Sequence, residues 1–132
     1  MNGREAFIRA GGTRLGGGEP LMSDAIRYGD LLLLSGRAAV DPATGEVRGV
    51  DFETQAQVVI DDIFAVLADG GSGPEHVLRV ECWLADRQYF AAWNRIFTAR
   101  FPSPRPARTT LVTGLPLPGL LIEIQVTAAV GS

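Results

Sequence analysis

The sequence has one cysteine, Cys82, no apolar run near the ~18 residues that cross a bilayer, and no cluster of basic residues. A single cysteine excludes an intrachain disulfide and a cysteine-rich metal site, so the chain requires no oxidising compartment. The N-terminal stretch MNGREAFIRAGG lacks an apolar signal core, which together with the missing span predicts a cytoplasmic protein with no membrane partner. The 12 basic and 15 acidic residues give a net charge of -3, which disfavours nucleic acid as a partner.

The length and composition of the chain are those of one domain of ordinary size. The 132 residues are 46% hydrophobic and 20% charged, without a low-complexity tract, so we expect a single domain over residues 1–132. Glycines crowd residues 11–20, but no strand-then-helix pattern surrounds them, so a phosphate-binding loop is not expected there. We therefore expect residues 1–18 to be a partly flexible N-terminal segment.

The first half of the chain reads as a hairpin followed by a helix. Residues 25–28 (AIRY), the Gly29-Asp30 turn and residues 31–37 (LLLLSGR) predict two strands, the second of them buried. From Asp51, which can cap a helix, apolar residues recur at steps of three and four up to Gly70-Gly71. This pattern predicts an amphipathic helix.

The second half alternates strands with another helix. Residues 77–84 (VLRVECWL) predict a strand with one apolar face made of Leu78, Val80, Cys82 and Leu84. Asp86 can cap a second helix that carries Phe90, Trp93 and Phe97 on one side and ends before Pro102. Residues 108–113 and 121–130 then predict two final strands.

This order of elements predicts an α+β domain with two helices on one face of a mixed sheet. Trp83, Val112 and Leu121 are expected to point away from the helices, and the chain has no third layer to cover them. An exposed apolar sheet face is a predicted interface, so we expect subunits to associate.

Two charged residues stand out in the final strands. Arg108 opens the strand in RPARTTLVTG and shares a face with Thr110 and Val112, while Glu123 lies in LIEIQVTAAV. One interpretation from the residues alone is a structural ion pair or exposed strand charges. The alternative is that Arg108 holds a substrate carboxylate and Glu123 positions a water as a general base.

The chain resembles the Rid (YjgF/YER057c/UK114) family of reactive-intermediate deaminases from about residue 19 to the C-terminus. The resemblance rests on an ordered set of segments: GDLLLLSGRAAVDPATGEV, QAQVVIDDI, VLRVECWLADRQYFAAWNRIF, RPARTT and IEIQVTAAV. It implies a chorismate-mutase-like fold assembled as a homotrimer, with active sites between subunits. It also implies hydrolysis of enamine and imine carboxylates, such as 2-aminoacrylate, to a 2-keto acid and ammonia.

The resemblance assigns roles to individual positions and requires neither a cofactor nor a metal. Arg108 matches the arginine that binds the substrate carboxylate, and Glu123 matches the acidic residue that positions the attacking water. Thr110 matches a position whose backbone contacts the substrate nitrogen, and Gly36 and Phe90 match positions that line the pocket.

Four positions depart from the family pattern and leave the substrate open, one of them Gln125, which replaces a frequent second glutamate. In LMSDA, Met22 stands where the family often has tyrosine and Asp24 where it has glutamine, and Arg37 also replaces a common glutamine. Met22 offers a flexible apolar surface in place of a hydroxyl. It is expected to line the substrate-binding pocket and to enlarge it or admit a different substrate side chain. This departure favours the alternative function, a non-catalytic trimer that binds a small carboxylate or a partner protein.

Overall fold

The computed structural model describes residues 3–7 and 20–131. Most of the N-terminal segment that was expected to be partly flexible, including residues 11–18, lies outside the described residues. Residues 4–7 form a strand that the sequence analysis did not anticipate. No helix in the described part of the chain has the length and apolar character that crossing a membrane requires.

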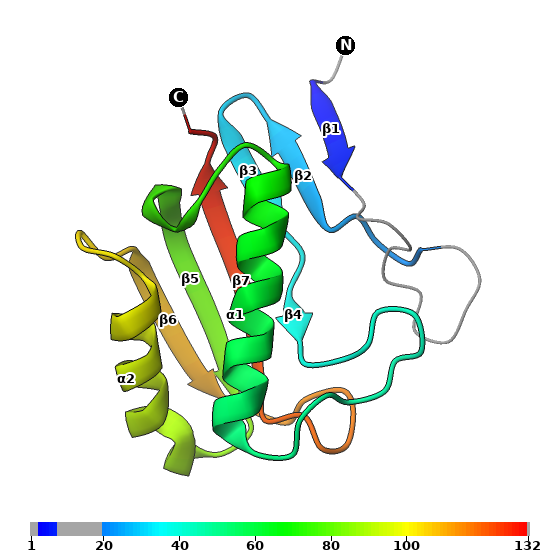
Figure 1. The fold of residues 1–132 in the computed structure, drawn as a ribbon, viewed down its shortest axis with the longest axis vertical. Coiled ribbons are helices and arrows are strands. Elements are labelled where there is room, and N and C mark those ends of the chain that lie inside the picture. Colours follow the sequence, from blue (N-terminus) through cyan, green and yellow to red (C-terminus); the bar gives the residue numbers. More distant parts are fainter. Residues whose placement is uncertain (1–2, 8–19, 132) are drawn as a thin grey trace.

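The described residues form seven strands in one mixed sheet (Figure 1). The strands are β1 (Arg4–Phe7), β2 (Ala25–Tyr28), β3 (Leu31–Leu34), β4 (Arg37–Ala38), β5 (Val77–Leu84), β6 (Ala107–Val112) and β7 (Ile122–Ala129). Their order in the sheet is β1-β2-β3-β7-β5-β6, and β4 also pairs with β7. Only β5 and β6, among these strands, pair in parallel, because the chain between them crosses the sheet as a helix.

Both α-helices of the described residues pack on the same face of the sheet (Figure 1), as predicted. α1 (Phe52–Asp69) begins where the Asp51 carboxylate accepts a hydrogen bond from the Thr54 amide at 2.7 Å, the expected N-cap. α2 (Phe90–Arg100) follows the short 3-10 helix η2 (Arg87–Tyr89), which Asp86 caps, and a second 3-10 helix, η1 (Pro74–His76), precedes β5. The predicted α+β fold with a mixed sheet and two helices is confirmed.

The core lies between the helices and alternate strand residues. In β7, Ile122, Ile124, Val126 and Ala128 are buried toward the helices, while Glu123 and Gln125 lie on the other face. That other face, called the open face below, has no layer over it in the described residues. Large exposed apolar side chains on it include Tyr28, Leu31, Leu33 and Leu111.

Two predicted positions on the strands were wrong. Leu78 is 48% exposed because a register shift between Val77 and Arg79 places Val77 in the buried position instead. Val112 lies beside Leu84 in the parallel β5–β6 pair, so it is on the helix-bearing side rather than the open face, although it is 53% exposed.

The predicted strand over residues 31–37 is interrupted. Leu33 lies opposite Thr127 in the β3–β7 pair, whereas Arg37 lies opposite Ile124 in the β4–β7 pair. The chain therefore advances four residues (33 to 37) while β7 advances three (127 to 124), which leaves one extra residue in the Ser35–Gly36 segment. Such irregularities are frequent next to functional sites because they bring the backbone and side chains into unusual positions.

Candidate functional site

A cavity of about 450 Å³ opens beside this interruption. Its walls come from the segment before β2, from the β3–β4 connection, β4 and the loop after it, from α1, and from β7 and the loop that leads into it. Three predicted site residues, Met22, Gly36 and Glu123, line it together. Below, this cavity is called the glutamate pocket.

The Glu123 carboxyl lies directly against the Gly36 backbone in this pocket, so a larger residue at position 36 would displace it. A Cβ atom added at Gly36 would lie 2.6 Å from Oε2 of Glu123, closer than atoms of this kind approach. Burial raises the pKa of the Glu123 carboxyl above its usual range. The Glu123 carboxyl has no hydrogen-bond or ion-pair partner among the described residues, so its oxygens are available to a ligand or a water.

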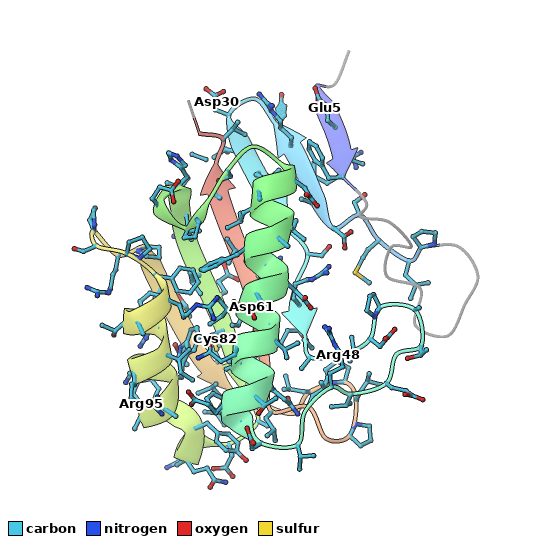
Figure 2. All side chains as sticks on the ribbon, in the orientation of Figure 1. Glu5, Asp30, Arg48, Asp61, Cys82 and Arg95 are labelled. Atoms are coloured by element: carbon cyan, nitrogen blue, oxygen red, sulfur yellow. The ribbon has the colours of Figure 1, made fainter. Side chains whose placement is uncertain are left out.

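The other polar side chains around the pocket are already bonded to the protein. The Ser35 hydroxyl donates to the Ser23 carbonyl at 2.7 Å, and the Gln125 amide donates to the Leu34 carbonyl at 3.3 Å. Asp62 of α1 accepts a hydrogen bond at 2.5 Å from Arg48, which is labelled in Figure 2. Glu123 thus differs from its polar neighbours in having its hydrogen-bonding capacity unused.

Two departures from the family pattern form a single feature. Nη1 of Arg37 donates to Oδ1 of Asp24 at 2.6 Å, and the two side chains are only 12% and 2% exposed. The charge that Arg37 brings to the pocket wall is therefore compensated by the carboxylate of Asp24. Each of the two side chains thus compensates the charge of the other.

We expect Asp24→Gln to lower the free energy of unfolding by about 3 kcal/mol, because it leaves a largely buried guanidinium without its carboxylate. Arg37→Gln is expected to be destabilising as well, and the double variant should lose less than the sum of the two single changes. The matched control is Glu53→Gln at the exposed Arg95–Glu53 pair, which is expected to cost at most about 1 kcal/mol. Denaturant unfolding of the four variants measures these differences, and strictly additive losses would contradict the coupling.

A buried amide that the sequence analysis did not single out holds the pocket wall. Gln55 of α1 is fully buried, and its Nε2 donates to the carbonyls of Gly49 at 3.1 Å and Gly119 at 2.8 Å. Its Oε1 accepts from the Leu121 amide at 2.9 Å. These bonds fix the loop that leads into β7, and with it the backbone just before Glu123. The feature of the sequence that could have identified Gln55 is a polar residue within an apolar helical stripe.

Arg108 belongs to a second group of residues, between β6 and α2. Its Nη2 donates to Oδ1 of Asn94 at 2.7 Å. Its guanidinium carbon lies 4.9 Å from the ring centre of Phe97 and 5.9 Å from those of Trp93 and Phe90. Cation–π attraction and the Asn94 bond hold the guanidinium in one orientation without an opposite charge. Asn94 was not predicted, because nothing in its helical spacing marks it.

Thr110 joins this group, called the arginine cluster below. Nε1 of the fully buried Trp93 donates to the Thr110 hydroxyl at 3.2 Å. Cys82, on the neighbouring strand and labelled in Figure 2, is 1% exposed, and burial raises the pKa of its thiol, which fits the expected small buried hydrophobe. The arginine cluster thus unites Arg108, Phe90 and Thr110 of the predicted site.

The glutamate pocket and the arginine cluster do not meet within one chain. Arg108 lies beside Val80 in the parallel β5–β6 pair, on the helix-bearing side. Glu123 lies opposite Trp83 in the β5–β7 pair, on the open face. Arg108 and Glu123 therefore form no ion pair with each other, and the interpretation of the two as a structural pair within one chain is wrong. Among residues 3–7 and 20–131, no three metal-ligating side chains gather into a possible metal site.

Comparison with known proteins agrees with this architecture. The family model described as endoribonuclease L-PSP matches residues 19–130. A RutC family protein of Pyrococcus abyssi is 34% identical over 107 residues, which cover 80% of this chain and 84% of the relative. The chloroplastic Reactive Intermediate Deaminase A of Arabidopsis thaliana is 35% identical over 104 residues, 78% of this chain and 55% of the relative.

A solved structure shares the fold over nearly the whole chain. The crystal structure of the Rid family protein YyfA from Yersinia pestis superposes with a TM-score of 0.83 at 25% identity, covering 96% of this chain and 99% of that one. Residues 19–130, which the family model matches, include both the glutamate pocket and the arginine cluster. On the family match, the relatives and the shared fold, this chain belongs to the YjgF/RutC family, which includes the Rid proteins.

Proposed function

We propose that the protein hydrolyses 2-imino acids and their enamine tautomers, such as 2-aminoacrylate, to 2-keto acids and ammonia. The observation that carries the proposal is the half-buried Glu123 carboxyl, which lies beneath Gly36 in an open pocket without a partner among the described residues. A carboxyl in this setting suits the binding and deprotonation of a water. The similarity to a plant reactive intermediate deaminase supports the same chemistry.

The reaction needs orientation and proton transfer. A water attacks C2 of the protonated imine and gives one proton to the Glu123 carboxylate, which forms a neutral carbinolamine. Glu123 returns that proton to the nitrogen, the C–N bond breaks, and the hydroxyl proton leaves with ammonia as ammonium. One protonated imine and one water thus give one 2-keto acid and one ammonium ion, with Glu123 returned to its starting state.

Arg108 is proposed to bind the substrate carboxylate. Its planar guanidinium can make two parallel hydrogen bonds to a carboxylate, and its fixed orientation against Asn94 and Phe97 reduces the entropy lost on binding. Because Arg108 and Glu123 lie on opposite faces of the sheet, a site that contains both must take them from different subunits. We therefore propose a homotrimer with a site at each subunit interface, in which the apolar side chains of the open face become buried.

The proposal is tested with the wild-type protein and 2-aminoacrylate generated in place from serine by a pyridoxal-phosphate enzyme. We expect keto acid to form faster than in the same mixture without the protein, and light scattering to give the mass of a trimer. A trimer that binds a small carboxylate but leaves the rate unchanged would favour the non-catalytic alternative. A stable monomer at micromolar concentration would contradict the intersubunit site.

A further inference from the structure

We infer that the glutamate pocket selects 2-imino acids with a bulky apolar side chain, such as those derived from leucine, over 2-aminoacrylate and over imino dicarboxylates. The inference rests on the proposed function and adds the class of substrate. It follows from which atoms of the pocket remain available to a ligand.

The walls of the glutamate pocket are mostly apolar. Apart from the polar residues already described, the pocket is lined by apolar side chains from separate segments, among them Met22, Val40, Pro116, Leu117 and Leu120. Met22 is 38% and Leu117 is 37% exposed, so a ligand in the pocket would remove apolar surface from water. Burial of apolar surface stabilises the complex in proportion to the area covered, which favours a large apolar side chain.

The polar side chains that line the pocket beside Glu123 are already bonded to other protein groups. Ser35, Gln125 and Asp62 each have their hydrogen bond to another protein group, as described above. A polar substrate side chain has only the remaining donors and acceptors of these three groups to bond with, and a buried polar group that stays unpaired is costly. Glu123 is left as the polar group that makes no bond to the described residues and so is available to the reacting centre, and most of the remaining pocket surface is apolar.

The pocket also disfavours a second carboxylate on the substrate. Arg37 is the residue on the pocket wall that could attract one, but its guanidinium is already bonded to Asp24 at 2.6 Å. A dicarboxylate would also bring a second negative charge near Glu123. The cavity of about 450 Å³ lies within the range of roughly 300–1,000 Å³ that holds drug-sized ligands, and 2-aminoacrylate is a far smaller molecule.

The test compares imines generated in place by an amino-acid oxidase from leucine, alanine and aspartate. We expect kcat/KM for the leucine-derived imine to exceed that for the alanine-derived imine at least about tenfold, the discrimination typical of an apolar pocket. The aspartate-derived imine should be the poorest substrate. Equal rates for leucine and alanine, or a preference for aspartate, would overturn the inference while leaving the deaminase proposal intact.

A variant and a binding measurement complete the test. Leu117→Asp places a charge on the exposed loop of the pocket wall and should reduce the leucine-to-alanine ratio at least about fivefold. The matched control is Val50→Asp, at a loop residue that is 95% exposed and does not line the pocket.

Calorimetry with the stable products 4-methyl-2-oxopentanoate and pyruvate reports the same preference without turnover. Tighter binding of the larger keto acid by a protein that hydrolyses no imine would support the subsite and reject the deaminase, whereas tighter binding of pyruvate would overturn the inference.

Discussion

Glu123→Gln is expected to lower kcat about 10²–10⁴-fold, because an amide can hold a water by hydrogen bonding but cannot accept its proton. Binding of a carboxylate product such as pyruvate should be retained, since the substitution keeps the shape of the side chain. The matched control is Glu81→Gln, at a partly buried glutamate on the neighbouring strand that lies opposite Gln125 and outside the pocket. A Glu123→Gln protein with wild-type turnover would show that another group activates the water.

The pH dependence follows from the same carboxyl. A general base works in its ionised form, so kcat/KM should fall as the pH decreases through the pKa of Glu123, which burial raises above its ordinary value. The acid limb of the profile should therefore lie above the ordinary glutamate range of about 4.3 and be absent in Glu123→Gln. The folded state binds this proton more tightly than the unfolded state, so ionisation of Glu123 should lower stability as the pH rises through the same window.

The sequence was sufficient for the elements whose periodicity is strong. The apolar spacing from Phe52 onward, with Asp51 as its cap, predicted α1, and the alternation in residues 121–130 predicted β7. β1 was missed because its four residues carry no clear pattern and stand before a glycine-rich stretch. The break between β3 and β4 was missed because LLLLSGR reads as one continuous apolar strand.

The relation between strands was not available from the sequence. The alternation of apolar and polar residues indicates which residues of one strand share a face. The register between paired strands decides on which face of the sheet those residues lie. Val112 shows this, because its pairing with Leu84 placed it on the side opposite to the one expected. The same register sets Arg108 and Glu123 on opposite faces. The Asp24–Arg37 pair was likewise invisible, since thirteen positions of sequence separate two residues that the β2–β3 hairpin brings together.

Mixing two inactive variants is expected to restore activity. If each site takes Arg108 from one subunit and Glu123 from its neighbour, neither Arg108→Ala nor Glu123→Gln alone leaves an intact site. A trimer that contains both kinds of subunit has an interface at which an unaltered Arg108 meets an unaltered Glu123. Random assembly of equal amounts would place such a pair at about one quarter of the interfaces, because the two chains there are drawn independently.

The measurement is turnover after the two variants have been unfolded and refolded together, compared with each variant treated alone. About a quarter of the wild-type rate is expected from the mixture, against a loss of ~10²-fold or more for each variant by itself. The matched control mixes Arg108→Ala with Arg108→Lys, which should restore nothing, because lysine cannot reproduce the two-point contact. Light scattering and thermal unfolding of Arg108→Ala must give a trimer of near wild-type stability. An Arg108→Ala protein that dissociates would identify Arg108 as a structural residue, and a mixture no more active than its components would rule out a site shared between subunits.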